Sequence, residues 1–214
     1  MKKKLDNKKE ITKVDELFTL SIRKLKNSDC SIEKMREFLK KKNASEDEIN
    51  EVINKLLKYS IINEDEMVKS IISFCDYKHY GYNKLIYILE SRKISKSRIK
   101  KIIKNEEREI KHAKELVKTL IKRYKNKNTV NLRRSVFSAL IRAGYDEIVA
   151  SSCATDISIS YKDEINMLKL DYQKVFLKVS KKYKGNEAKQ KTINRLVSKG
   201  YKIDDIKKVI TKEI

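Results

Sequence analysis

The sequence predicts an all-α protein, arranged as an elongated, curved tandem array of four three-helix repeats. Two features of the composition support this fold class. The 214 residues include no proline and only four glycines, so few residues interrupt a helix. Apolar residues make up 40% and charged residues 38% of the chain. That balance suits a thin helical array, which has more surface per residue than a compact globule.

A leucine that ends a basic, amphipathic helix recurs at a nearly constant interval. These anchor leucines are Leu39, Leu89, Leu140 and Leu196. Their separations of 50, 51 and 56 residues are close to the periods of helical repeats. We therefore expect a flexible basic N-terminal arm and four repeats, at residues 1–12, 13–60, 61–106, 107–160 and 161–214. A unit of this size has a marginal core alone, and stacking on its neighbours would bury shared apolar faces.

Each repeat is expected to open with a helix of its own. The predicted first helices run over about Lys13–Lys26, Glu64–His79, Glu107–Tyr124 and Lys162–Tyr183. In the second of them, apolar residues such as Ile71 and Cys75 recur at spacings of three and four, which predicts one apolar helical stripe. Asn63 is the expected N-cap of this helix, and Glu66 is a possible capping-box partner.

The second helix of each repeat ends at the anchor leucine, and a fixed position follows it. Four residues after the anchors stand Asn43, Lys93, Gly144 and Gly200. Asn and Gly readily adopt the left-handed conformation at a helix C-terminus, so we expect such caps here. Lys93 departs from this pattern.

A short third helix is expected after each of these caps, starting near Ile49, Ile99, Ile148 and Ile206. Ile102 and Ile103 follow Ile99 at the same spacing at which Val52 and Ile53 follow Ile49, which predicts the same apolar stripe. Ser45 with Glu48 predicts a capping box, and Ser95 is the expected cap of the corresponding helix in the second repeat.

The charge of the chain points to a polyanionic partner. Lys and Arg number 52 against 30 Asp and Glu, a net charge of +22. Such a balance predicts attraction to nucleic acid, an anionic membrane face or an acidic protein. No stretch approaches the roughly 18 apolar residues of a membrane span, so we expect no membrane partner. Basic residues concentrate after Leu89, and we infer a basic surface over repeats two to four.

The sequence shows no recognisable arrangement of catalytic residues, cofactor-binding residues or metal ligands. The four glycines form no phosphate-binding loop, and three scattered cysteines favour a reducing compartment over a disulfide framework. Cys75 and His79 lie four residues apart, but two ligands do not make a metal site. His112 lies among charged residues, where a solvated histidine is the ordinary interpretation. We expect no enzyme activity, cofactor or metal.

Two segments carry a resemblance to a known family. Gly81-Tyr82-Asn83-Lys84-Leu85-Ile86-Tyr87-Ile88-Leu89 is similar to a Gly-Pro-x-Arg-Ile-x-x-Glu-Leu pattern of the RecX family, and Ser31 to Asn43 is similar to the pattern of that family's first unit. The resemblance covers about Asp15 to Ile214. Tyr82 replaces the proline and Lys84 the arginine, and lysine lacks the planar fork of arginine.

The resemblance implies a cytoplasmic, non-enzymatic regulator of recombination, repair and the SOS response. Such a protein would lie along the groove of a RecA–DNA filament and tune, most simply inhibit, its ATP hydrolysis and strand exchange. Its expected partners are the RecA filament and the phosphates of single- or double-stranded DNA, and a monomer would suit the groove. The alternative is a general nucleic-acid-binding helical module, such as a helix-turn-helix regulator; the Lys-rich second helices lack an obvious reading helix.

The candidate contact residues are basic, apart from two tyrosines. Tyr80 and Tyr82 stand beside Lys78 at a predicted elbow, where they either stack on bases or seal the join of two helices. The full set is Lys78, Tyr80, Tyr82, Lys84, Arg92, Lys93, Arg98, Arg133, Arg134, Lys189, Lys191 and Arg195.

Overall fold

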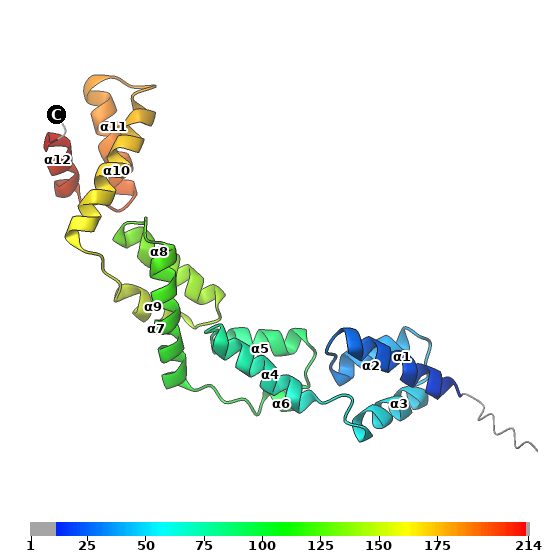
Figure 1. Ribbon diagram of the computed structural model, residues 1–214. Coiled ribbons are helices and arrows are strands. Elements are labelled where there is room, and N and C mark those ends of the chain that lie inside the picture. Colours follow the sequence, from blue (N-terminus) through cyan, green and yellow to red (C-terminus); the bar gives the residue numbers. More distant parts are fainter. Residues whose placement is uncertain (1–11, 213–214) are drawn as a thin grey trace, which may run out of the picture. The chain divides into compact units, whose positions relative to one another are not determined.

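The computed structural model describes residues 12–212. Over this range the chain is helical and contains no β-strand, which confirms the predicted all-α class (Figure 1). The basic arm predicted at residues 1–12 lies outside the described residues, except for Thr12.

The described helices occur in four consecutive trios. Their bounds are α1 (Lys13–Asn27), α2 (Ile32–Lys40), α3 (Glu46–Lys58), α4 (Glu64–Tyr77), α5 (Tyr82–Ser91), α6 (Lys96–Ile99), α7 (Glu106–Arg123), α8 (Thr129–Arg142), α9 (Glu147–Thr155), α10 (Tyr161–Val179), α11 (Gly185–Ser198) and α12 (Ile203–Lys212). Each anchor leucine lies near the end of α2, α5, α8 or α11, and all four are fully buried. The residue boundaries given above for the repeats stay a prediction.

The helices form two compact units, each described by itself. The first unit comprises the chain up to Lys78 together with Leu85–Lys104. The second unit comprises His79–Lys84 together with the chain from Asn105 onward. In the first unit, the side chains of α1–α3 enclose a core that includes Leu17, Met35 and Leu56. The second unit has two such cores, one in α7–α9 around Leu132 and Val136 and one in α10–α12 around Leu196 and Ile206.

The residues four positions after the anchor leucines all adopt the left-handed conformation, as predicted for Asn43, Gly144 and Gly200, and Lys93 does so although it departs from the Asn/Gly pattern. Their φ angles are +55° at Asn43, +59° at Lys93, +92° at Gly144 and +94° at Gly200. Gly144 also allows a close approach of two backbones, because a Cβ there would lie 2.3 Å from the amide nitrogen of Lys84. A side chain at this position would therefore force the two segments apart.

A buried or half-buried glutamate at the start of a trio accepts a hydrogen bond from the preceding trio. The Ile32 N–H at the start of α2 donates to Glu64 over 2.8 Å, and the Tyr82 N–H at the start of α5 donates to Glu109. The Thr129 N–H at the start of α8 donates to Glu164 over 3.1 Å. Each contact gives a helix N-terminus an acceptor and a negative charge, both of which stabilise it.

The third helix of the second trio differs from the prediction. Helix α6 ends at Ile99, and Ile102 and Ile103 follow it outside any helix, with Ile103 88% exposed. The Ser95 side chain makes no capping hydrogen bond to α6, so that expectation was wrong. Lys96 and Arg98 lie in its only turn, where positive charge opposes the helix dipole. Ser45 and Glu48 of α3, by contrast, form the predicted capping box.

Asn63 caps the N-terminus of α4, as the sequence predicts. The Asn63 side chain accepts hydrogen bonds from the backbone N–H groups of Asp65 and Glu66, at 3.1 and 3.2 Å. None of the described helices is long and apolar enough to cross a lipid bilayer.

Candidate partner-binding surface

The described residues include no cluster of metal-ligating side chains. No three His, Cys, Asp or Glu side chains of residues 12–212 come close enough together to hold a metal ion. The His79 ring meets the ring of His112 edge-on, with centroids 5.3 Å apart. Cys75 is buried. These neighbours make His79 part of the packing between α7 and the segment that precedes α5.

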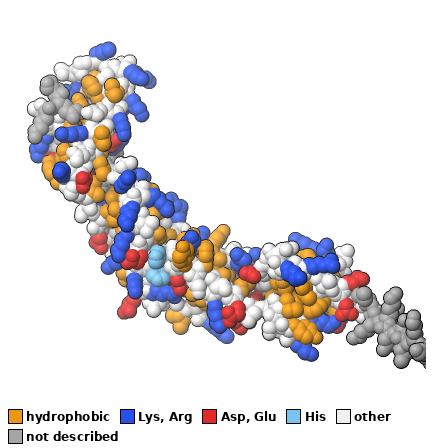
Figure 2. Space-filling model, viewed as in Figure 1, with side chains coloured by type: hydrophobic (Ala, Val, Ile, Leu, Met, Phe, Trp, Pro, Cys, Tyr) orange, Lys and Arg blue, Asp and Glu red, His pale blue; other side chains and the backbone are white. Residues whose placement is uncertain are grey.

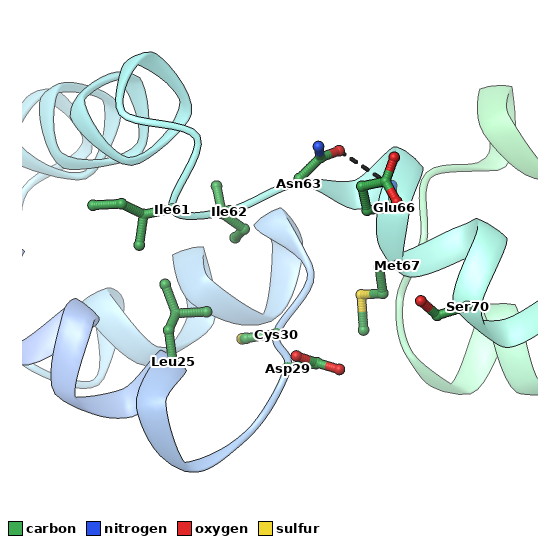
Figure 3. Close-up of a pocket in the computed structure, with 9 residues that line it drawn as sticks. All are labelled: Leu25, Asp29, Cys30, Ile61, Ile62, Asn63, Glu66, Met67 and Ser70. Carbon is green, nitrogen blue, oxygen red and sulfur yellow. Dashed lines mark hydrogen bonds between the residues drawn. The ribbon is translucent and has the colours of Figure 1, made fainter.

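A small pocket lies where the end of α1, the segment after α3 and the start of α4 meet (Figure 3). Its volume is about 240 Å³, and Leu25, Ile62 and Met67 are among the residues that line it. Cys30 lies at its wall, and burial raises the pKa of this thiol. A thiol with a raised pKa is a poor nucleophile at neutral pH, so Cys30 does not give this pocket a reactive group.

The predicted residues at the elbow between α4 and α5 divide into exposed and packed groups. Lys78 is exposed, and its ammonium lies 5.0 Å from the centroid of the Tyr77 ring. Tyr80 packs against the core of α7–α9, and Tyr82 is half-buried. Lys84 is half-buried beside Gly144. Tyr80 is therefore engaged by the core of α7–α9, while Lys78 reaches solvent.

Two of the three predicted basic residues after α5 are engaged by carboxylates of the same unit. Lys93 pairs with Glu37, and Arg98 lies 2.9 Å from Asp65 and 3.2 Å from Glu64. The hydrogen bond from Arg98 lowers the pKa of Asp65, and the one from Lys93 lowers the pKa of Glu37. Arg92 is exposed and lines a shallow hollow beside α2.

The two arginines near the start of α8, Arg133 and Arg134, also differ in their exposure to solvent. Adjacent helical residues point in different directions. The Arg133 guanidinium is half-buried and donates to the backbone oxygen of Ile157 over 2.7 Å. Arg134 is exposed to solvent. Arg133 therefore ties α8 to the end of α9, and Arg134 is the member of the pair that a partner can reach.

All three predicted residues on α11 are exposed. Lys191 and Arg195 lie one turn apart on the same side of the helix, and Lys189 lies on the other side of the buried stripe that contains Thr192 and Leu196. The Lys191 ammonium lies 5.3 Å from the centroid of the Tyr183 ring. This helix presents the most accessible part of the predicted set.

Further basic side chains reach solvent at positions that the sequence argument passed over. Lys111 and Lys122 on α7 are exposed, on the side turned away from buried Ala113 and Val117. Figure 2 shows Lys and Arg side chains over much of the face in view, with apolar patches between them. In the sequence, these lysines could have been identified by their helical spacing, which places them opposite the apolar stripe of α7.

Comparisons with known proteins agree on one family. The chain is 29% identical over 168 residues to "Regulatory protein RecX" of Streptococcus agalactiae serotype III, an alignment that covers 76% of this chain and 64% of that protein. It is 26% identical over 193 residues to "Regulatory protein RecX" of Listeria monocytogenes serotype 4a, covering 85% of this chain and 69% of the relative. The chain thus spans just under two thirds of the Streptococcus protein's length. No protein-family model matches it.

A solved structure matches the fold. The crystal structure of RecX from Lactobacillus salivarius aligns with a TM-score of 0.56 and 16% sequence identity, over 67% of this chain and 95% of the other. An identity this low supports the shared helical fold alone, whereas the aligned sequences of the Streptococcus and Listeria proteins carry the relationship. In both sequence and fold, the chain is therefore similar to the RecX family of regulatory proteins.

Proposed function

We propose that this protein binds a RecA–DNA filament as a monomer and lowers the recombinase's ATP hydrolysis and strand exchange. Similarity to proteins named "Regulatory protein RecX" supports a regulatory role. The observation that carries the binding proposal is the set of exposed basic side chains on α8 and α11, namely Arg134, Lys189, Lys191 and Arg195. None of the described carboxylates forms an ion pair with any of these four, so their charge is available to a polyanion.

The proposed contact depends mainly on phosphates. Lysine and arginine side chains that neutralise phosphates release condensed counterions, which makes the affinity fall steeply as salt rises. Such contacts position a protein on nucleic acid without reading its sequence. Binding to bare DNA is therefore expected to be weak, sequence-independent and strongly dependent on salt. A log–log plot of affinity against salt concentration tests this, and a flat plot would remove the electrostatic argument.

The decisive experiment measures recombinase ATPase on single-stranded DNA with and without this protein. The informative variant reverses charge at Arg134, Lys191 and Arg195, all of which are exposed. Arg133 is left intact, because its bond to Ile157 makes it a structural residue. We expect the concentration for half-maximal inhibition to rise at least about tenfold, because each lost phosphate contact weakens binding.

The matched control reverses the same number of charges in the first trio, at Arg23, Lys26 and Lys58, which are also exposed. This variant should shift the inhibition curve by less than about twofold if the contact is local rather than a response to net charge. Equal effects of the two variants would contradict the proposed surface. If the wild-type protein bound bare DNA as tightly as the filament and left the ATPase unchanged, it would instead be a general nucleic-acid-binding helical module.

A further inference from the structure

The solvent side of α10 carries two leucines that remain uncovered within residues 12–212. Leu170 is 57% exposed and Leu177 is 67% exposed, whereas Leu168, Val175 and Val179 of the same helix are buried. Residues seven apart in an α-helix lie on one face, separated by about 10.5 Å along the axis. Leu170 and Leu177 therefore form a short apolar ridge, called here the α10 ridge.

Helix α7 opens the third trio as α10 opens the fourth, and it shows that this architecture does not require such a ridge. In α7, Ala113 and Val117 face the core of α7–α9, and the opposite side carries Lys111, Lys118 and Lys122. Uncovered leucines lower solubility without adding to a core, and when they share one helix face they are typical of a contact surface. Packing within the described chain therefore does not account for the α10 ridge.

Apart from Asp171, the charged residues from Leu170 to Lys182 are basic. Lys174 lies between the two leucines, four residues after Leu170 and three before Leu177, and it is exposed. Lys178 and Lys181 follow, also exposed, and no carboxylate of the described chain pairs with any of these three lysines.

Asp171 does not offset this charge, although it is the single acidic residue between positions 165 and 182. Its carboxylate lies 2.8 Å from the Lys199 ammonium and accepts a hydrogen bond from the Tyr201 hydroxyl over 3.0 Å. The negative charge is therefore neutralised within α10–α12, and the ridge itself is apolar and positive.

We propose that the α10 ridge docks an acidic amphipathic helix of a partner protein. The partner's apolar side chains would cover Leu170 and Leu177, and its carboxylates would meet Lys174 and its neighbours. Nucleic acid alone would use the lysines and leave the leucines in water. A second copy of this chain would bring two charges of +22 together. The proposal does not depend on the regulatory function proposed above.

The test uses a synthetic peptide of about 18 residues, with leucines at helical spacing and glutamates on the other face. Its affinity for the full chain is measured by fluorescence anisotropy. We expect the double substitution Leu170→Ser with Leu177→Ser to weaken binding at least about tenfold, because the two side chains are the apolar centre of the contact. Lys174→Glu should weaken it about fivefold by placing like charges opposite each other.

The controls separate the ridge from general exposure and charge. Ile148→Ser alters an isoleucine on α9 that is 82% exposed, and it should change peptide affinity by less than about twofold. Because all the altered side chains are exposed, circular dichroism should give each variant the melting curve of the wild type.

Two results would overturn the proposal. One is an unchanged peptide affinity in the double-leucine variant. The other is failure of the peptide to bind, while the double substitution weakens binding to a single-stranded oligonucleotide or to phosphatidylglycerol vesicles about tenfold. The ridge would then be a nucleic-acid or membrane contact.

Discussion

The trios α1–α3 and α4–α6 share one helix order but differ in how firmly their parts are held. In α1–α3, buried apolar side chains from all three helices and the following segment meet in one cluster. In α4–α6 the buried apolar residues are fewer, and none of them lies in α6: they are Ile71, Cys75, Leu85, Leu89 and Ile94. The repeat pattern therefore specifies the order of helices, while local capping and core size decide how stable each trio is.

The third helices carry most of this difference. Helix α3 begins with the Ser45–Glu48 capping box and three acidic residues in its first turn, and four of its apolar residues are buried. Helix α6 begins with an uncapped turn that contains Lys96 and Arg98, and no residue of it is buried. Acidic residues stabilise a helix N-terminus and basic residues oppose it, so both the dipole and the cap favour α3.

Truncating the anchor leucines should produce the largest effect and sharpen the comparison. Leu39 and Leu89 are equivalent, and both are fully buried. We expect Leu39→Ala to cost about 4 kcal/mol and Leu89→Ala about 2 kcal/mol, because the cost rises with the cavity that remains and the thinner core can collapse. Urea unfolding followed by circular dichroism measures both. A larger cost for Leu89→Ala would mean that the second trio is the better packed of the two.

Hydrogen exchange should separate the third helices directly. The interior amides of α3, such as those of Ile53 and Leu56, should exchange at least about 100-fold more slowly than those of Ile99 and Lys100, a difference of about 2.7 kcal/mol in opening free energy. Mass spectrometry of the native protein resolves the two segments. Equal protection would show that α6 is stabilised by something other than its cap and its burial.

Much of the fold was predictable because it depends on local chemistry. The spacing of apolar residues located the helices, and Ser45 and Glu48 marked a cap. An Asn or Gly four residues after three of the anchor leucines indicated a left-handed cap. The prediction was wrong at Ile102 and Ile103, because Ser95 does not cap α6 and the first turn of this helix is basic. Propensity and charge at a helix start can outweigh the stripe that follows it.

Long-range partners could not be predicted in the same way. Glu64 is an unremarkable acid at a helix start in the sequence, yet it accepts from Ile32, which lies 32 residues away. Arg98 and Arg133 resemble free basic residues, but their partners Asp65 and Ile157 come from other elements. Only the docking of those elements reveals which charges are used within the chain.

Removing the caps should have a smaller effect that again differs between the trios. Ser45→Ala should cost about 1 kcal/mol, since it leaves the N–H of Glu48 without its acceptor. Ser95→Ala should cost less than about 0.3 kcal/mol, because its side chain caps nothing and bonds to Ser97 instead. Urea unfolding of the two variants tests the contrast. A comparable loss from Ser95→Ala would show that Ser95 caps α6 in solution.

The smallest predicted effect concerns the left-handed position itself. Lys93 adopts φ +59° with a side chain that disfavours this region, whereas Asn43 at the equivalent position has a φ of +55° and tolerates it. Lys93→Gly should therefore stabilise the protein by about 0.5 kcal/mol, because relief of strain slightly exceeds the added entropy of the unfolded chain and the lost pair with Glu37. Asn43→Gly should be neutral within about 0.3 kcal/mol.

Salt separates the two contributions at Lys93. At about 1 M NaCl the exposed pair with Glu37 is screened, so the gain from Lys93→Gly should increase relative to low salt, while Asn43→Gly should respond little. Urea unfolding at both salt concentrations measures the shift. A destabilised Lys93→Gly at high salt would mean that the left-handed lysine is not strained, and the second trio would then owe its weakness to its core and to α6 alone.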